Sequence, residues 1–97
     1  KIRRINFDNI LYIEGLKDYI KVFTDNEPKP IMSLNTLKTI EQKLPEEQFM
    51  RIHRSYIVNL DKVETIERSR IVFGKNYIPV SDQYKEKFQE FVNRRFF

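Results

Sequence analysis

Short apolar runs separated by turn residues dominate the chain, a pattern that predicts β-strands more than long helices. Strands are expected at residues 10–13, 19–23, 30–33, 62–67, 70–73 and 77–80. Turns are expected over residues 14–18, which contain Gly15, and at Gly74-Lys75-Asn76. Turn signals spaced by about 8–12 residues are typical of an antiparallel β meander.

Two stretches of the chain change to helical spacing. The first covers residues 34–44 and places three apolar residues on one face, namely Leu37, Ile40 and Leu44. Ser33 or Asn35 is its expected N-cap, and Pro45 ends it. The second helix follows Ser81, a good N-cap, and its apolar face comprises Tyr84, Phe88, Phe91 and Val92. The predicted fold class is mainly β, with small antiparallel sheets, one short internal helix and a C-terminal helix.

The segment over residues 49–60 combines strand-like alternation with a cationic, polar surface. No acidic residue occurs in these twelve positions, and the polar side chains are Arg51, His53, Arg54, Ser55, Tyr56 and Asn59. If the segment is one strand, its apolar residues anchor it while the polar residues face an anion. This segment is the first candidate for a binding surface.

Composition limits the classes of protein that the chain can represent. Its 97 residues suit one domain, and 40% hydrophobic residues are enough for a core. Without cysteine there is no disulfide framework or thiolate metal site, and one histidine argues against a transition-metal site. No apolar run approaches the roughly 18 residues of a membrane span. We expect no cofactor, no metal, no membrane and a cytoplasmic location.

The formal net charge of +4 is concentrated at the two ends of the chain. Five of the 18 basic residues lie there, namely Lys1, Arg3, Arg4, Arg94 and Arg95. The remaining 13 face 14 acidic residues, which leaves a net charge of −1. An anionic polymer would therefore be bound by a local patch and not by a polycationic body.

Catalytic motifs are absent from the sequence. The two glycines lie far apart and form no phosphate-binding loop. His53 and Ser55 are two residues apart, and no nucleophile elbow surrounds either of them. We therefore expect that the protein is not an enzyme.

An ordered set of motifs resembles the LytTR DNA-binding domain family. The central motif comprises Phe49, Arg51, His53, Arg54, Ser55, Tyr56, Val58 and Asn59. Around it, three further pieces are similar to the family's first hairpin, short helix, and closing strand with helix: residues 10–14 with 18–20, residues 37–44, and residues 78–81 with Tyr84. The resemblance covers about residues 5–92, in the family's order.

The resemblance implies an elongated, mostly β domain at residues 7–97, after the end of an interdomain linker at residues 1–6. The start without Met and its basic residues agree with such a linker. Domains of this family form the C-terminal output half of bacterial two-component response regulators, behind an N-terminal receiver domain. They bind double-stranded promoter DNA, typically as dimers, and loops instead of a recognition helix enter the major groove. Transcription regulation is the expected function.

The first region that the resemblance assigns to DNA is the first hairpin turn, with Lys17, Asp18 and Tyr19, joined by Lys21 on the next strand. Lys17 suits a phosphate or a guanine edge, and Tyr19 a phosphate or a thymine methyl. The alternative is an ordinary hairpin tip with Tyr19 in the core.

The second region is the central motif. Arg54 occupies the position where the family places a base-reading side chain, and arginine can bond guanine O6 and N7 bidentately. Ser55 and Tyr56 are expected to hold phosphates. The alternative for Arg54 is a surface ion pair with a neighbouring glutamate.

Three other residues of this motif have structural alternatives. Arg51 is a candidate DNA contact that could instead brace the turn at Glu46-Glu47. His53 is expected to be a partly buried structural histidine. Asn59 is expected to satisfy backbone groups at the strand end.

The third region is the start of the last helix, where Ser81 and Gln83 are candidate contacts. The family often has a basic residue after the serine, but this chain has Asp82. A carboxylate there is repelled by phosphates, although it can accept from cytosine N4 or stabilise the helix N-terminus. Lys85 could substitute, and Lys75 is a further phosphate candidate.

Sequence-specific DNA binding is the leading hypothesis. The alternative is a β-rich protein-interaction or sensory module without DNA binding, which the near-neutral body and Asp82 favour. A small-molecule-binding domain is a third option, against which the abundant phenylalanine argues, because it indicates a filled core.

Overall fold

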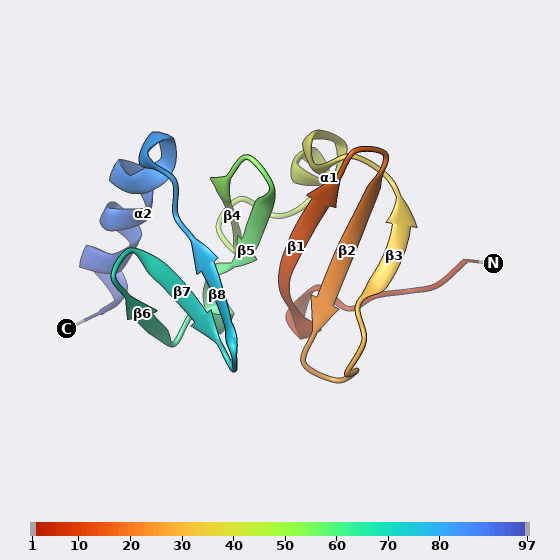
Figure 1. The fold of residues 1–97 in the computed structure, drawn as a ribbon, viewed down its shortest axis with the longest axis horizontal. Coiled ribbons are helices and arrows are strands. Elements are labelled where there is room, and N and C mark those ends of the chain that lie inside the picture. Colours follow the sequence, from red (N-terminus) through yellow and green to blue (C-terminus); the bar gives the residue numbers. More distant parts are fainter. Residues whose placement is uncertain (1, 97) are drawn as a thin grey trace.

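The computed structural model describes residues 2–96, and its strands form two antiparallel sheets flanked by two α-helices (Figure 1). The five-stranded sheet has the order β3-β2-β1-β5-β4, with β1 Ile10–Leu16, β2 Tyr19–Thr24, β3 Ile31–Leu34, β4 Phe49–His53 and β5 Tyr56–Asn59. The three-stranded meander comprises β6 Thr65–Glu67, β7 Arg70–Phe73 and β8 Asn76–Pro79. The helices are α1 Leu37–Lys43 and α2 Asp82–Arg95, with 3-10 turns at Phe7–Asn9 and Leu60–Lys62. The predominance of strands and extents of 43 × 25 × 22 Å confirm the predicted elongated, mainly β fold.

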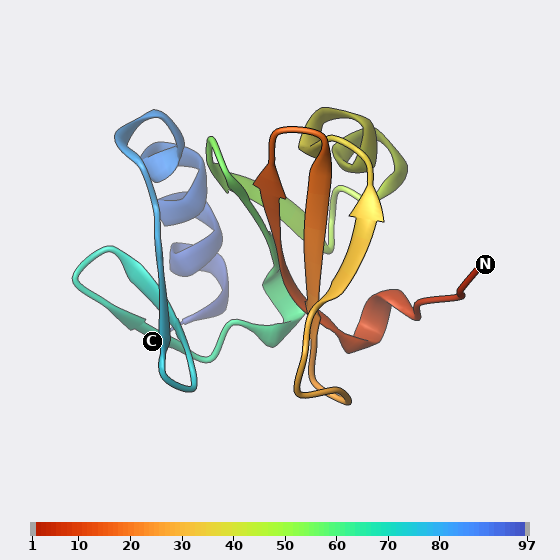
Figure 2. The ribbon, with the colours of Figure 1, turned by 45° about the vertical axis from the view of Figure 1, so that its right-hand side comes forward.

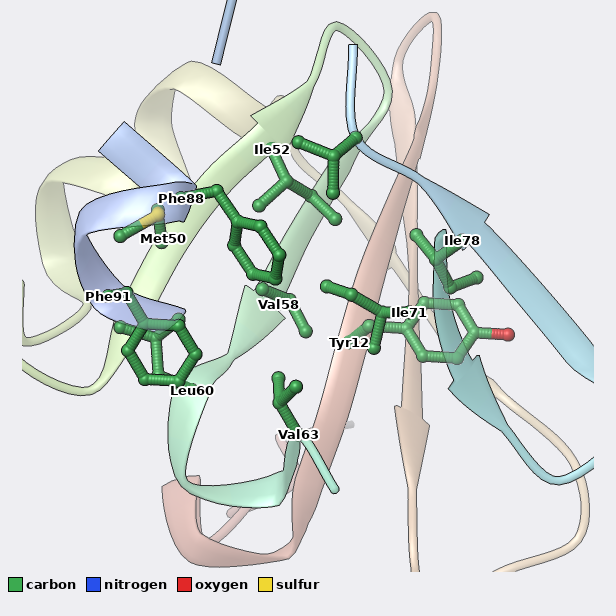
Figure 3. Packing of buried hydrophobic residues seen from close by; sticks show 11 residues of the cluster. Tyr12, Met50, Ile52, Val58, Leu60, Val63, Ile71, Ile78, Phe88 and Phe91 are labelled. Carbon is green, nitrogen blue, oxygen red and sulfur yellow. The ribbon is translucent and has the colours of Figure 1, made fainter. Parts of the chain in front are cut away.

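Alternation along the strands gives the five-stranded sheet two buried faces. On one face, Ile20 and Val22 of β2 belong to a buried apolar cluster. Leu37 of α1 and Leu44, which caps the end of α1, cover this cluster. The opposite face packs against the meander and α2. The side chains of this second cluster include Tyr12, Met50, Ile52, Val58, Ile71, Ile78, Phe88 and Phe91 (Figure 3). A one-residue shift of register would reverse both faces, so burial on each side determines the pairing.

Tyr12 joins the two sheets. Its ring stacks on Phe23 of β2 at 4.4 Å and on Phe73 of β7 at 5.3 Å. Burial, followed by the nearby Glu14 carboxylate and Tyr56, raises the pKa of Tyr12 to about 12. The neutral phenol therefore behaves as a core aromatic at physiological pH.

The prediction of one strand over residues 49–60 is wrong. A turn at Arg54-Ser55 divides the segment into β4 and β5, which pair antiparallel with His53 opposite Tyr56. The register shifts between Arg51 and His53, so the polar residues do not follow one regular alternation. The cationic segment is a hairpin with Arg54 at its tip.

The predicted start and cap of the internal helix are also wrong. Leu34 is the last residue of β3, where it pairs with Tyr19. The helix begins at Leu37, and Thr36 caps it by accepting a hydrogen bond from Thr39 N at 3.2 Å. Pairing with β2 thus outweighs the helical periodicity of residues 34–36. The stop at Pro45 is confirmed, since α1 ends at Lys43.

Two strand boundaries differ from the sequence prediction by three residues, and the other boundaries by at most one. The first strand continues through Gly15 to Leu16, which leaves Lys17-Asp18 as the turn. The strand expected at residues 62–67 is limited to Thr65–Glu67, because Leu60–Lys62 forms a 3-10 turn. The predicted C-terminal helix after Ser81 is confirmed.

Alanine at Gly15 is expected to lower the free energy of unfolding by about 1–3 kcal/mol. A Cβ there would lie 2.6 Å from Leu37 Cγ, and Leu37 is buried in the α1 cluster. Urea unfolding measures the loss. Leu37→Ala should then lower the free energy of unfolding less in the Gly15→Ala background than in the parent, because it opens the space that the new Cβ needs. Equal costs in both backgrounds would contradict the clash.

Candidate nucleic-acid interface

Three loops lie at the same end of the strands, along the upper edge of the molecule in Figures 1 and 2: the β1–β2 turn, the β4–β5 turn and the β8–α2 junction. Antiparallel pairing of β1 with β5 places the end of one beside the start of the other. Two backbone hydrogen bonds join the loops. Gly15 N donates to Ser55 O at 2.8 Å, and Ser81 N donates to Ile52 O at 3.0 Å. The three regions expected from the sequence therefore lie beside one another, and we call them together the end surface.

The β1–β2 turn presents Lys17, Asp18 and Tyr19 to solvent. Lys17 has a φ of 35°, in the left-handed region that the commonest two-residue hairpin turns use. Tyr19 is 45% exposed, so the alternative that places it in the core is wrong. Lys21 is half-buried and lies opposite Glu14, in the third residue pair from the tip.

The β4–β5 turn presents Arg54 at its tip, with an exposed side chain. Within residues 2–96 Arg54 forms no ion pair, so the proposed surface pair with a glutamate is not observed. The His53 ring is half-buried, and its Nδ1 accepts a hydrogen bond from Ser55 N at 3.0 Å. His53 is thus a structural residue of the turn, as predicted.

Tyr56 begins β5 with its ring 5.3 Å from that of His53. Its hydroxyl donates to Glu14 Oε2 at 3.4 Å. Burial is the largest cause that raises the pKa of Tyr56, and the Glu14 carboxylate adds to it. The hydroxyl therefore stays protonated and can donate a hydrogen bond.

Arg51 lies on β4 directly behind the turn. Its Nε donates to His53 O at 2.8 Å and its Nη2 to Arg54 O at 2.7 Å. Its Nη1 pairs with Glu41 Oε1 of α1 at 2.9 Å. Arg51 therefore braces the turn that follows it and not the Glu46-Glu47 turn suggested by the sequence.

At the β8–α2 junction, Ser81 occupies the N-cap position without a side-chain capping bond. Its Oγ instead lies 3.5 Å from Ile52 O, to which it donates. Asp82 is the first helical residue, and its exposed carboxylate pairs with Lys85 at 2.9 Å. The hydrogen bond and charge of Lys85 lower the pKa of Asp82. Asp82 thus stabilises the first turn of α2 through Lys85, while Gln83 stays exposed.

Two other sequence candidates lie away from this end. The β7–β8 turn, which contains Lys75, lies at the opposite, lower edge of the molecule in Figures 1 and 2. Asn59 is fully buried, its Nδ2 donates to Ile10 O at 2.8 Å, and its Oδ1 accepts from Asp61 N at 3.0 Å. The predicted backbone role of Asn59 is confirmed.

Two residues of the end surface escaped the sequence analysis. Leu34 is 73% exposed and pairs with Tyr19, so the two side chains form an exposed apolar surface beside the β1–β2 turn. Its assignment to the internal helix concealed this position. Glu41 is the acidic partner of Arg51, and no spacing rule relates a helix residue to a turn on another element.

The described residues offer no metal centre and no membrane span. Within residues 2–96, no group of three or more His, Cys, Asp or Glu side chains could hold a metal ion. None of the helices in this part of the chain is long and apolar enough to cross a membrane.

Comparison with known proteins gives consistent matches. The family model of the LytTr DNA-binding domain matches residues 1–93. The sensory transduction proteins LytT of Bacillus anthracis and Enterococcus faecalis are 30% and 32% identical, over 91% and 82% of this chain. The chain spans only 37% and 35% of their lengths. A solved LytTr DNA-binding domain from a methyl-accepting/DNA response regulator of Bacillus cereus has the same fold, with a TM-score of 0.76 at 24% identity over 91% of this chain and 84% of that one.

Proposed function

The chain belongs to the LytTr DNA-binding domain family, and from this premise we propose that it binds double-stranded promoter DNA sequence-specifically as the output domain of a bacterial two-component response regulator. One observation carries the proposal. Three loops joined by backbone hydrogen bonds present exposed Lys17 and Arg54 at one end. Two carboxylates near them, Glu41 and Asp82, are each paired with a cation.

The β1–β2 and β4–β5 tips are proposed to enter the major groove together. They belong to neighbouring strands of one sheet, and a groove about 12 Å wide admits a two-stranded β-ribbon. Arg54 would read a guanine through O6 and N7, and Lys17 a phosphate or a guanine edge. Tyr19, beside the exposed Leu34, would contact a phosphate or a thymine methyl.

The remaining contacts are proposed to be to phosphates. Ser55 lies in the β4–β5 turn and Tyr56 follows it as the first residue of β5. Ser81 and Gln83 lie at the start of α2, and Lys21 lies in the third residue pair from the β1–β2 tip. Lys75 is not included, because its turn lies at the other end of the domain.

Two partners complete the proposal. The relatives are about two and a half times as long as this chain, which leaves room for a receiver domain before it in the full-length protein. Two copies of the domain would bind repeated half-sites on one duplex, with a spacing set by the helical turn of DNA.

A salt titration tests whether the domain binds DNA through phosphates. Anisotropy with a duplex selected from a random pool should give a straight line of log affinity against log salt. Its slope should be about −3 to −4, for three to four neutralised phosphates. Lys17→Ala should reduce the slope by about 1, whereas the matched control Lys75→Ala should leave it unchanged. A flat line would refute the proposal and favour a protein-interaction module.

A further inference from the structure

Arg51 connects helix α1 to the turn that carries Arg54, and we propose that it is a positioning residue for base reading and not a DNA contact. This inference rests on the proposed function of Arg54. It replaces the direct contact expected for Arg51 from the sequence, because its three guanidinium nitrogens already have acceptors within the protein.

The two carbonyl groups that Arg51 holds belong to the peptides on either side of Arg54. One is His53 O, in the peptide before Arg54, and the other is Arg54 O, in the peptide after it. Fixing both peptide planes restrains φ and ψ of Arg54, since those are the only soft backbone torsions between them. The direction in which the Arg54 side chain leaves the turn is thereby set before DNA arrives, which lowers the ordering cost of binding.

The turn has few other means of keeping its shape. Arg54 and Ser55 are neither glycine nor proline, and neither has a positive φ. Besides Arg51, the internal support from side chains is the bond from Ser55 N to His53 Nδ1. Charge-assisted bonds from a guanidinium are stronger than neutral ones, so Arg51 is the main internal restraint.

Glu41 fixes the third side of the guanidinium. The ion pair at 2.9 Å reaches from α1 to β4, and the Arg51 side chain is only 19% exposed. A DNA phosphate would have to displace Glu41 to reach Nη1. The carboxylate therefore serves to orient Arg51 if Arg51 positions the turn, and opposes binding if Arg51 is a phosphate contact.

These two roles predict opposite effects of Glu41→Gln. A positioning role predicts that affinity for the selected duplex falls by about three- to ten-fold relative to random duplex. A phosphate contact predicts that affinity for both duplexes rises, because the competing carboxylate is gone. Glu47→Gln is the matched control, since it removes the same charge from an exposed residue that forms no ion pair within residues 2–96.

Arg51→Lys separates the roles in a second way. A lysine keeps the charge for a phosphate but cannot bond two carbonyls and a carboxylate with a planar fork. Its ratio of specific to random affinity should fall about ten-fold with an unchanged salt slope. In an Arg54→Ala background, neither Arg51→Lys nor Glu41→Gln should change the ratio further. A retained ratio in Arg51→Lys, or an undiminished effect without Arg54, would overturn the inference.

A measurement without DNA keeps this inference distinct from the proposed function. In the Arg51→Lys variant, loosening of the turn should speed hydrogen exchange at two amides. These are the Ser55 amide, which bonds to His53 Nδ1, and the Gly15 amide, which bonds to Ser55 O. Core amides and the urea midpoint report whether the Arg51→Lys domain stays folded. Unchanged exchange at both turn amides would overturn the positioning role, whether or not the parent domain binds DNA. Loss of salt-dependent binding by the parent would instead refute the proposed function.

Discussion

Replacing Arg54 by alanine is expected to lower affinity for the selected duplex by about 5- to 150-fold, the equivalent of about 1–3 kcal/mol. Affinity for random duplex should fall by only about two- to three-fold, because one cation among several phosphate contacts is lost. The reason is geometric. Arg54 is at the exposed tip of the β4–β5 turn, without an ion-pair partner within residues 2–96, so its guanidinium group is available to a guanine edge.

Anisotropy titrations with the selected and a random duplex at one salt concentration measure both affinities. Arg54→Lys should restore most of the random-duplex affinity without restoring the specific component, because an ammonium lacks the bidentate fork. Arg94→Ala is the matched control: it removes an exposed arginine near the end of α2, far from the three loops. Equal losses for both duplexes would reduce Arg54 to a phosphate contact.

Replacing Phe91 by alanine is expected to lower the free energy of unfolding by about 3–5 kcal/mol. Phe91 is 2% exposed, and it packs beside Phe88 in the cluster (Figure 3). Its ring lies 5.7 Å from that of Phe88 and 5.8 Å from that of Phe96. It belongs to the cluster that packs α2 and the meander against the five-stranded sheet. Since domains are stable by only about 5–15 kcal/mol, this loss removes a large share of the total.

Equilibrium urea unfolding, followed by circular dichroism, measures the effect. Lys87→Ala on the same helix removes an exposed side chain and should change stability by no more than about 0.5 kcal/mol. The β8–α2 junction depends on this packing, because Ser81 N bonds to Ile52 O of the sheet that α2 covers. A loss of less than about 1 kcal/mol for Phe91→Ala would mean that the cluster closes over the cavity.

The hairpin over residues 49–59 shows why one turn escaped the sequence analysis. Glycine, proline or asparagine marks most predicted turns, but Arg54-Ser55 contains none of them. Side chains hold this turn instead, through Arg51 and His53.

The sequence by itself determined the types of most elements, the order of the family's motifs and the loops that carry candidate contacts. Local periodicity and turn chemistry encode these features, so neighbouring residues are sufficient to predict them. Only the tertiary structure decided that the three loops share one end, that Lys75 lies at the other, and that Arg51 is bound to Glu41 and the turn. Such contacts join segments far apart in the chain, and they form because the five-stranded sheet must bury two faces at once, against α1 on one side and against α2 with the meander on the other.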